Sequence, residues 1–190
     1  LEELESLTIN NLGQLTEIPA SIGSCINLKT FSLQRSGLIS LPEEMSGLKN
    51  VTSVTITNNP NLKRLSEGFY DMTEVVTLNI NSNPSLDCEL SENIRKMDKL
   101  KGTLSLYSNA FTGPIPEGIG YFKEVTSLNL SNNWLTKIPE SIGDMTKLQT
   151  LSLYDNNFVD SDLSGGLPAS LGKLKNLTTL SVYTTDAAKE

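Results

Sequence analysis

The sequence predicts an α/β solenoid, in which short strands from successive repeats form one parallel sheet and tight helical turns cover its outer side. Two observations lead to this prediction. A triplet of apolar residues, seen most clearly as Val125, Leu128 and Leu130, recurs at intervals of 23 to 29 residues along the chain. An Ile-Pro or Leu-Pro dipeptide follows most of these triplets, as at Ile138-Pro139. A period in this range is typical of a solenoid and not of a globule built from unrelated elements.

Each repeat is expected to contain one short strand. Apolar and polar residues alternate in Leu128-Asn129-Leu130, which is typical of a strand with one buried face. Because each repeat holds a single strand, neighbouring repeats must pair their strands in parallel, about 4.8 Å apart. The second apolar residue of each triplet marks the eight predicted strands: Leu7, Phe31, Val54, Leu78, Leu104, Leu128, Leu151 and Leu180.

The chain returns from each strand through a segment that predicts a 3₁₀ or short α turn on the outer face. Proline removes a backbone N–H, so it suits an extended residue or the first turn of a helix. Three residues after the proline comes an apolar residue, often followed by glycine, as in Ile142-Gly143, and another apolar residue follows three positions later. In the third and fourth repeats Ser66 and Ser91 take the place of the proline.

A row of asparagines is expected to be structural. The chain must bend after each strand, which leaves backbone groups without strand partners. A buried carboxamide both donates and accepts hydrogen bonds, so stacked asparagines can satisfy those groups from one repeat to the next. Ser36 takes this position in the second repeat, whereas Ser131, two residues before Asn133, is expected to point outward. The predicted row consists of Asn59, Asn83, Asn109, Asn133 and Asn156.

These residues resemble the leucine-rich repeat family. The repeats that begin at Leu100, Val125 and Leu148 follow the family pattern LxxLxLxxNxLxxxIPxxLGxLxx almost completely. Residues 109–116, NAFTGPIP, are similar to the NxFxGxIP form of plant-type extracellular repeats. The resemblance implies a right-handed solenoid, shaped as a segment of a curved horseshoe, with a concave parallel sheet. It also implies a single domain of about eight repeats over residues 1–190.

The same resemblance implies an extracellular or cell-surface location. Plant-type ectodomains usually carry paired-cysteine caps, whereas the two cysteines of this chain, Cys25 and Cys88, lie about 14 Å apart along the predicted stack. A disulfide needs Cα atoms within about 7 Å, so both are expected to be free thiols. Free thiols leave an intracellular location open. Because Leu1 falls in the middle of a repeat, the chain is expected to be a fragment of a longer protein.

Composition excludes several classes of protein. The net charge of −7 argues against nucleic acid as a partner, because nucleic acid requires a basic face. No apolar run approaches the length of about 18 residues that a membrane-spanning helix needs. The charged residues fall mainly on the return segments, which predicts a solvated convex surface.

The sequence favours a protein without catalytic activity, cofactor or metal. It contains no histidine, which excludes histidine-based catalytic triads and metal sites. It also lacks a glycine-rich phosphate loop and a GxSxG motif. Asp155, Asp160 and Asp162 do not follow the spacing of a calcium loop, so the segment Val159–Gly166 is interpreted as a solvated loop or a contact for a partner.

The concave face is the candidate binding surface. The two outward positions that flank each strand marker hold only serine, threonine and asparagine, among them Asn129. Tyr107, Tyr154 and Tyr183 follow three residues after their markers, with Asp155 beside them and Arg35 near the other end. Exposed tyrosines offer a large contact area with a polar tip, so they predict a site for another protein, a peptide or a glycan.

Two other interpretations fit the same residues. The tyrosines could stack across strands merely to stabilise the sheet. The whole module could be a structural spacer or stalk of a larger cell-surface protein, with no ligand of its own. Residues 129–131 form an N-glycosylation acceptor, and a glycan on Asn129 would favour the spacer because it would block the concave face.

Overall fold

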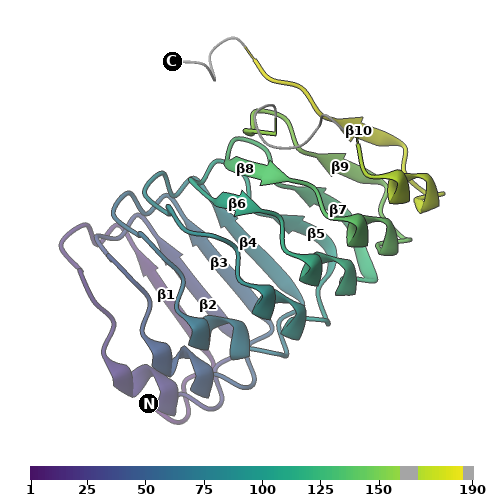
Figure 1. Cartoon of the computed structure of the whole chain (residues 1–190). Coiled ribbons are helices and arrows are strands. Elements are labelled where there is room, and N and C mark those ends of the chain that lie inside the picture. Colours follow the sequence, from purple (N-terminus) through teal and green to yellow (C-terminus); the bar gives the residue numbers. More distant parts are fainter. Residues whose placement is uncertain (159–166, 186–190) are drawn as a thin grey trace.

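The structure, a computed structural model, describes residues 1–158 and 167–185, in which eight strands form one parallel sheet. Figure 1 shows the strands side by side, in the order β1-β2-β3-β4-β5-β7-β9-β10. Every strand contains its predicted marker residue, and the register pairs marker with marker, as in Leu7 with Phe31. The strands are β1 (Ser6–Asn10), β2 (Thr30–Gln34), β3 (Ser53–Thr57), β4 (Thr77–Asn81), β5 (Lys101–Ser105), β7 (Glu124–Asn129), β9 (Thr150–Ser152) and β10 (Thr179–Ser181).

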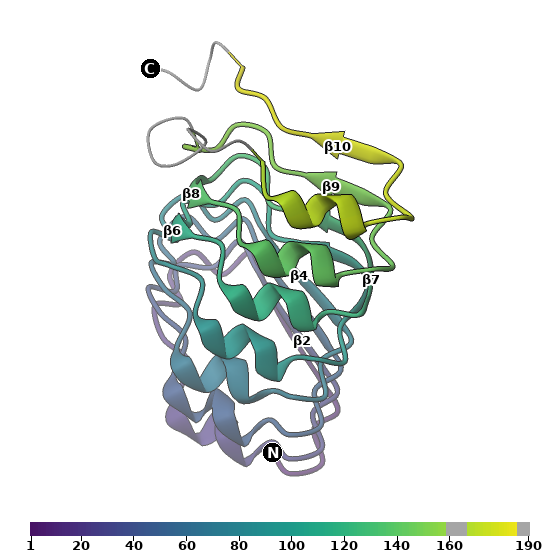
Figure 2. The ribbon, with the colours of Figure 1, turned by 45° about the vertical axis from the view of Figure 1, so that its right-hand side comes forward.

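The return segments form 3₁₀ helices, as predicted, and Figure 2 shows them stacked in a column across from the sheet. Of the seven helices in the described residues, five are preceded by a proline, and Ser66 and Ser91 precede the other two. None of the described helices is long and apolar enough to cross a membrane. The helices are η1 (Ala20–Ser24), η2 (Glu43–Gly47), η3 (Glu67–Asp71), η4 (Glu92–Lys96), η5 (Glu117–Tyr121), η6 (Glu140–Asp144) and η8 (Ala169–Lys173).

A second, two-stranded parallel sheet, which the repeat pattern did not predict, joins two return segments. It consists of β6 (Thr112–Pro114) and β8 (Trp134–Lys137). The Trp134 N–H donates to the Phe111 carbonyl at 2.8 Å, and the Ile115 N–H donates to the Lys137 carbonyl at 3.0 Å. Strands of three and four residues are too short for a periodic pattern to reveal them in the sequence.

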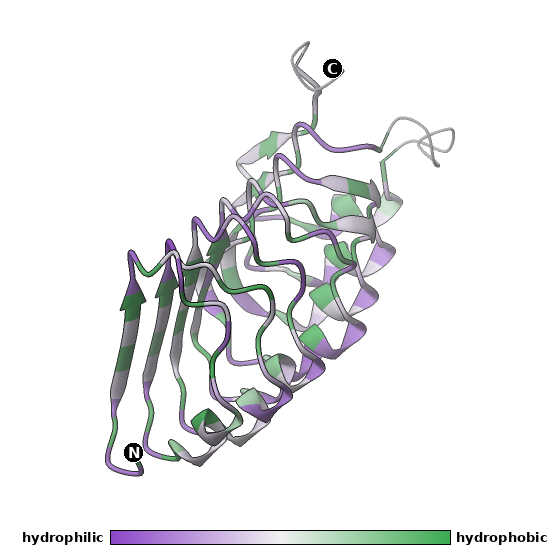
Figure 3. Cartoon of the chain, turned by 90° about the vertical axis from the view of Figure 1, so that its left-hand side faces the viewer, coloured by the Kyte–Doolittle hydropathy of each residue, from purple (hydrophilic) through white to green (hydrophobic). Residues whose placement is uncertain are grey.

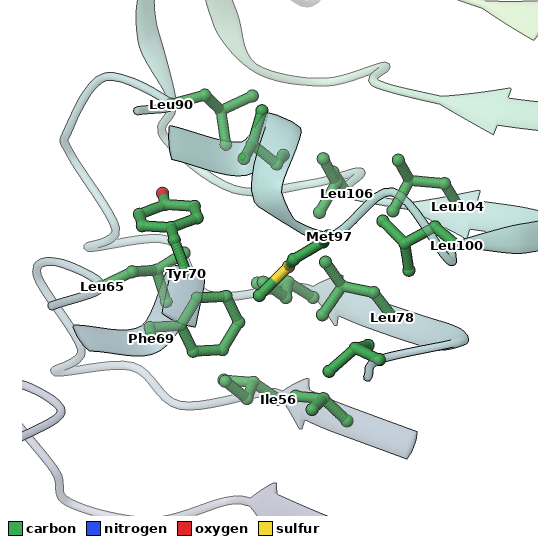
Figure 4. Packing of buried hydrophobic residues seen from close by; sticks show 14 of the residues in the cluster. Ile56, Leu65, Phe69, Tyr70, Leu78, Leu90, Met97, Leu100, Leu104 and Leu106 are labelled. Carbon is green, nitrogen blue, oxygen red and sulfur yellow. The ribbon is translucent and has the colours of Figure 1, made fainter. Parts of the chain in front are cut away.

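The core fills the space between the large sheet and the 3₁₀ helices. Figure 3 shows hydrophobic and hydrophilic residues alternating along the strands and the helical turns. In Figure 4, Ile56, Leu78 and Leu104 project from the strands toward Phe69 of η3 and Met97, which follows η4. All five are buried. Because each repeat buries its residues against the next one, the repeats share one continuous core.

The asparagine row is confirmed as a buried hydrogen-bond ladder. The Asn83 side-chain oxygen accepts the Asn59 backbone N–H at 3.0 Å, and its nitrogen donates to the carbonyls of Ile56 and Asn81. Ser36 fits this ladder through its N–H and hydroxyl, which donate to Asn59 Oδ1 at 3.0 and 2.8 Å. Buried backbone groups without strand partners are therefore satisfied from one repeat to the next.

A further row of residues adopts left-handed backbone conformation, directly after strands β1 to β4 and three residues after strands β5, β7 and β9. Its φ angles lie between 48° and 58°, a region that asparagine and aspartate tolerate better than most residues. The backbone N–H of each residue donates to a carbonyl of the next repeat, as from Arg35 to Thr57 at 3.2 Å. The row consists of Asn11, Arg35, Asn58, Ser82, Ser108, Asn132 and Asp155.

Several charged side chains on the convex surface connect neighbouring repeats. The Glu43 carboxylate accepts the Gly68 N–H at 2.9 Å, and the Glu140 carboxylate accepts the Ser170 N–H at 3.0 Å. A glutamate at the start of one 3₁₀ helix therefore accepts a backbone N–H near the start of the next helix, where such groups have no partner within the helix. Lys96 forms an ion pair with Asp71 of the preceding repeat at 2.8 Å.

Both cysteines are free thiols, as predicted. Cys25 is fully buried in the core. Cys88 is partly buried, and this burial raises the pKa of its thiol above the ordinary value.

Candidate functional site

The floor of the concave face is polar, and some of its side chains are hydrogen-bonded to neighbouring polar side chains. Most of its serine, threonine and asparagine side chains are exposed or half-buried, although Ser32 is buried. Gln34 Nε2 donates to Ser32 Oγ at 3.0 Å, and the Ser105 hydroxyl donates to Asn81 Oδ1 at 3.0 Å. These contacts leave a surface with hydrogen-bonding groups and little apolar area.

The three predicted tyrosines stand at one edge of this floor, each at the same position of its repeat. Backbone hydrogen bonds fix that position, because the carbonyls of Tyr107, Tyr154 and Tyr183 accept N–H groups of the preceding repeats at 3.2, 3.0 and 2.8 Å. Tyr107 and Tyr154 are half-buried, whereas Tyr183 is 55% exposed. The C-terminal half of the concave edge thus holds three aromatic side chains in register.

Tyr154 and Tyr183 form a stacked pair. Their ring centroids lie 5.1 Å apart and their planes differ by 8°. Stacking of this kind stabilises neighbouring strands and also produces a broad aromatic surface. Tyr107 lies two repeats before Tyr154, and Ser131 occupies the same position in the repeat between them.

The expectation that Ser131 points outward without structural consequence is wrong. Its side chain is fully buried. Its hydroxyl and its backbone N–H donate to Asn129 Oδ1 at 2.5 and 3.1 Å. A serine is small enough to fold back onto the preceding strand, and the sequence position shared with the tyrosines gave no signal of this contact.

Asn129 and Asp155 lie beside the tyrosines but already have structural partners. Asn129 uses its side-chain oxygen to hold Ser131. Asp155 has a φ of 52°, and its carboxylate accepts the Thr185 N–H at 2.5 Å. Both side chains are half-buried, so each retains some exposed surface for a ligand.

No metal site accompanies these residues. Over residues 1–158 and 167–185, no group of three or more histidine, cysteine, aspartate or glutamate side chains could hold a metal ion. The predicted contacts of Asp160, Asp162 and the segment Val159–Gly166 lie outside the described residues.

Arg35 is not part of the tyrosine cluster. It is exposed in the left-handed row after β2, whereas Tyr107 follows β5. Three strand spacings separate β2 from β5, which is roughly 14 Å. Arg35 could therefore contact only a ligand that extends along the sheet.

Trp134 was missed by the sequence analysis. Its side chain is 58% exposed on β8, away from the large sheet, and it borders a groove of about 790 Å³. A signal was present in the sequence, because Trp134 directly follows the ladder residue Asn133. In the neighbouring repeats that position holds Ala110 and Asn157, so a tryptophan there departs from the repeat pattern.

Known proteins share this repeat sequence. Residues 123–168 match the family described as Leucine Rich repeats (2 copies). Receptor-like protein 7 of Arabidopsis thaliana is 29% identical over 172 residues, which are 88% of this chain and 16% of that protein. Phytosulfokine receptor 1 of Arabidopsis thaliana is 38% identical over 93 residues, 47% of this chain and 9% of the receptor.

One relative is an enzyme. The adenylate cyclase of Schizosaccharomyces pombe is 28% identical over 158 residues, which are 82% of this chain and 9% of that protein. This chain thus spans 16% or less of the length of each of these three relatives.

Solved structures share the architecture. A leucine-rich repeat protein of Leptospira interrogans superposes with a TM-score of 0.67 at 28% identity, over 97% of this chain and 50% of that chain. The structure of a TDR receptor superposes with a TM-score of 0.72 at 26% identity, over 95% of this chain and 31% of the receptor chain. The plant peptide hormone receptor RGFR1, in complex with RGF2, superposes with a TM-score of 0.56 at 25% identity, over 96% of this chain and 40% of the receptor chain.

Proposed function

We propose that this chain, which belongs to the leucine-rich repeat proteins and is distantly homologous to plant receptor-like proteins, recognises a peptide through its concave face. The observation that carries the proposal is the row of Tyr107, Tyr154 and Tyr183 at the edge of an uncharged floor. The similarity to RGFR1, which is described as a plant peptide hormone receptor in complex with RGF2, supports a peptide as the ligand.

The tyrosines would supply the main binding contacts. Binding energy usually concentrates in a few aromatic or arginine side chains, each worth about 2 kcal/mol or more on truncation. The serine, threonine and asparagine floor offers donors and acceptors to a peptide backbone but little apolar area to bury. Asn129 and Asp155 add polar groups beside the rings, and Arg35 would contact the far end of an extended peptide.

The stacked pair makes the site rigid before a ligand arrives. Tyr154 and Tyr183 hold each other in place at a centroid distance of 5.1 Å. A side chain that is already ordered loses less entropy on binding, so more of the contact energy contributes to affinity. Tyr107 lies outside this pair, and its truncation therefore tests binding without removing the stack.

A location at the cell surface belongs to the same proposal. It is supported by the receptor-like relatives and by the NAFTGPIP segment at residues 109–116. Leucine-rich repeats also occur in adenylate cyclase and in bacterial proteins, so protease protection of the native protein on intact cells is the direct test. Complete resistance to an added protease until the cells are lysed would overturn this part of the proposal.

The binding experiment begins with selection of peptides from a random displayed library on the wild-type protein. We expect the Tyr107→Ala variant to bind the selected peptides about 30-fold more weakly than the wild type, which corresponds to about 2 kcal/mol of binding free energy. Tyr121→Ala is the matched control, because Tyr121 is 56% exposed on η5 at the convex side and lies outside the site. Circular dichroism and thermal melts confirm that both variants fold.

Two results would count against the proposal. If peptides bind Tyr107→Ala and Tyr154→Ala as tightly as the wild type, the tyrosine row is not the site. If selection enriches no peptide on the wild type and the native protein carries a glycan on Asn129, the module is a structural spacer and the proposal of peptide recognition is wrong.

A further inference from the structure

Trp134 stands out on the side of the solenoid where β6 and β8 pair. Each of the neighbouring repeats places one residue directly after its ladder asparagine, and these residues are Pro84, Ala110, Trp134 and Asn157. Trp134 is the one bulky side chain in this set, and it is 58% exposed. Its backbone is fixed by the 2.8 Å hydrogen bond to Phe111 and by its pairing with Thr112. The indole is thus presented from a regular sheet.

Two hollows border Trp134. Trp134 borders the groove of about 790 Å³, which extends toward Ser85 and Asp87 of an earlier repeat. It also borders a smaller hollow of about 190 Å³, which extends toward Asn132 and Asp155. The small side chain of Ala110 helps to leave the larger groove open. A flat aromatic group with space beside it is suited to stacking against a ligand.

The groove is polar apart from the indole, alanine, glycine and proline. Ser85, Thr112 and Asn157 provide hydroxyl and carboxamide groups, and among the described residues no leucine, isoleucine, valine, methionine or phenylalanine lines it. A site for an apolar side chain would be lined mainly by such residues. Lys63 and Asp87 contribute one positive and one negative charge, so the groove does not select a ligand of either sign.

We propose that this flank of the solenoid binds a neutral oligosaccharide, with one sugar ring stacked on Trp134. The face of a pyranose ring carries C–H groups that are apolar and weakly positive, and these complement the negative face of an indole. The sugar hydroxyls both donate and accept, which matches the hydroxyl, carboxamide and carboxylate groups of Ser85, Asn157 and Asp87. The groove volume of about 790 Å³ exceeds that of a single sugar ring, so the groove accommodates a short chain of sugars.

The larger groove, in which the sugar site lies, shares no lining residue with the proposed peptide site. It lies beside β6 and β8, whereas the tyrosine row lies at the edge of the large sheet. It extends the proposed function, because the same module would contact a polysaccharide and a peptide on different faces. Loss of one activity would leave the other intact.

The test uses the protein's single tryptophan as its own probe. Neutral hexasaccharides (cellohexaose, laminarihexaose, xylohexaose and mannohexaose) are titrated while the emission of Trp134 is recorded. We expect at least one of them to give a saturable change in emission, and the same affinity by isothermal titration calorimetry.

The variants locate the site. Trp134→Leu should weaken the binding measured by calorimetry by at least tenfold, and Asn157→Ala should weaken it by a smaller factor. Tyr121→Leu, which changes an equally exposed aromatic on the convex side, should leave it unchanged. The proposal is overturned if none of the hexasaccharides binds at millimolar concentration, if Trp134→Leu binds normally, or if only a charged oligogalacturonide binds.

Discussion

The side-chain oxygen of Asn133 accepts a hydrogen bond of 3.1 Å from the backbone N–H of Phe111, a residue of the preceding repeat. The Asn133 side-chain nitrogen donates to the carbonyls of Leu106 and Leu130 at 3.0 Å. In the earlier repeats the oxygen bonds instead to the preceding ladder residue, as in the bond from the Asn83 N–H to Asn109 Oδ1. The change in partner occurs where β6 and β8 form the second sheet.

Replacement of Asn133 by alanine should destabilise the protein. The Phe111 N–H would lose its partner inside the core, and the carbonyls of Leu106, Leu130 and Ser131 would each lose one donor, at a cost of about 1–3 kcal/mol. Urea denaturation of Asn133→Ala measures this loss. Ser127→Ala, a change on the half-exposed concave floor, is the control and should alter the free energy of unfolding little. Because Ser131 is buried and bonded to Asn129, Ser131→Ala should fall between these two variants.

Gly143 and Gly172 occupy the same position in the 3₁₀ helices η6 and η8 but differ in the space around them. A Cβ on Gly143 would lie 2.4 Å from the Ser170 carbonyl oxygen, whereas a Cβ on Gly172 would meet no atom within 4 Å. Gly143→Ala should therefore cost about 1–3 kcal/mol through overpacking. Gly172→Ala should be neutral or slightly stabilising in urea denaturation, because alanine restricts the unfolded chain. Equal effects would show that the 3₁₀ helices are not in close contact.

Arg35 has an unfavourable backbone conformation for its type. Its φ is 48°, in a row where the other residues are asparagine, serine and aspartate. Arg35→Asn should raise the free energy of unfolding by up to about 1 kcal/mol, because asparagine adopts the left-handed region more readily. Arg64→Asn, which removes the same charge elsewhere, separates this effect from electrostatics. A loss of stability in Arg35→Asn would mean that the arginine side chain makes a contact that outweighs the strain.

The Glu140 carboxylate should make stability dependent on pH. The side chain of Ser170, then its backbone N–H, holds the pKa of Glu140 below the ordinary value. A lowered pKa in the folded state means that the contribution is complete above the pKa of the unfolded glutamate. It is lost as the pH falls through the folded pKa.

Urea denaturation at neutral and acidic pH tests this expectation. Glu140→Gln should be less stable than the wild type at pH 7, and the difference should disappear in acid. Glu44→Gln, which changes an exposed glutamate at the start of η2, should show no such convergence. A difference between the wild type and Glu140→Gln that stays constant across the pH range would contradict the proposed cause.

Tyr183 should stabilise the last strand in addition to any role in binding. Tyr183→Ala removes the stack on Tyr154, which is worth about 0.5–1.5 kcal/mol. Hydrogen exchange of the Asp155 amide, which donates to the Tyr183 carbonyl, should accelerate. Tyr107→Ala lies outside the stack and should leave the exchange of this amide unchanged. Equal acceleration in both variants would show that the stack does not hold the strand.

The sequence alone determined the repeat architecture, because the cause of that architecture is local and periodic. Alternation around markers such as Leu128 predicted each strand of the large sheet, and a single strand per repeat required parallel pairing. Proline and glycine at fixed distances predicted the outer turns, and Ser66 took the place of proline in sequence and in structure. The carboxamide chemistry of residues such as Asn83 predicted the buried ladder.

Only the tertiary structure decided how individual side chains meet across repeats. The stacking of Tyr183 on Tyr154, the inward turn of Ser131 and the exposure of Trp134 beside a groove all depend on contacts between residues far apart in the chain. A periodic pattern specifies which face a residue shares with its strand. It does not specify which neighbour fills or leaves the space beside that residue, because that depends on the volumes and hydrogen bonds of adjacent repeats.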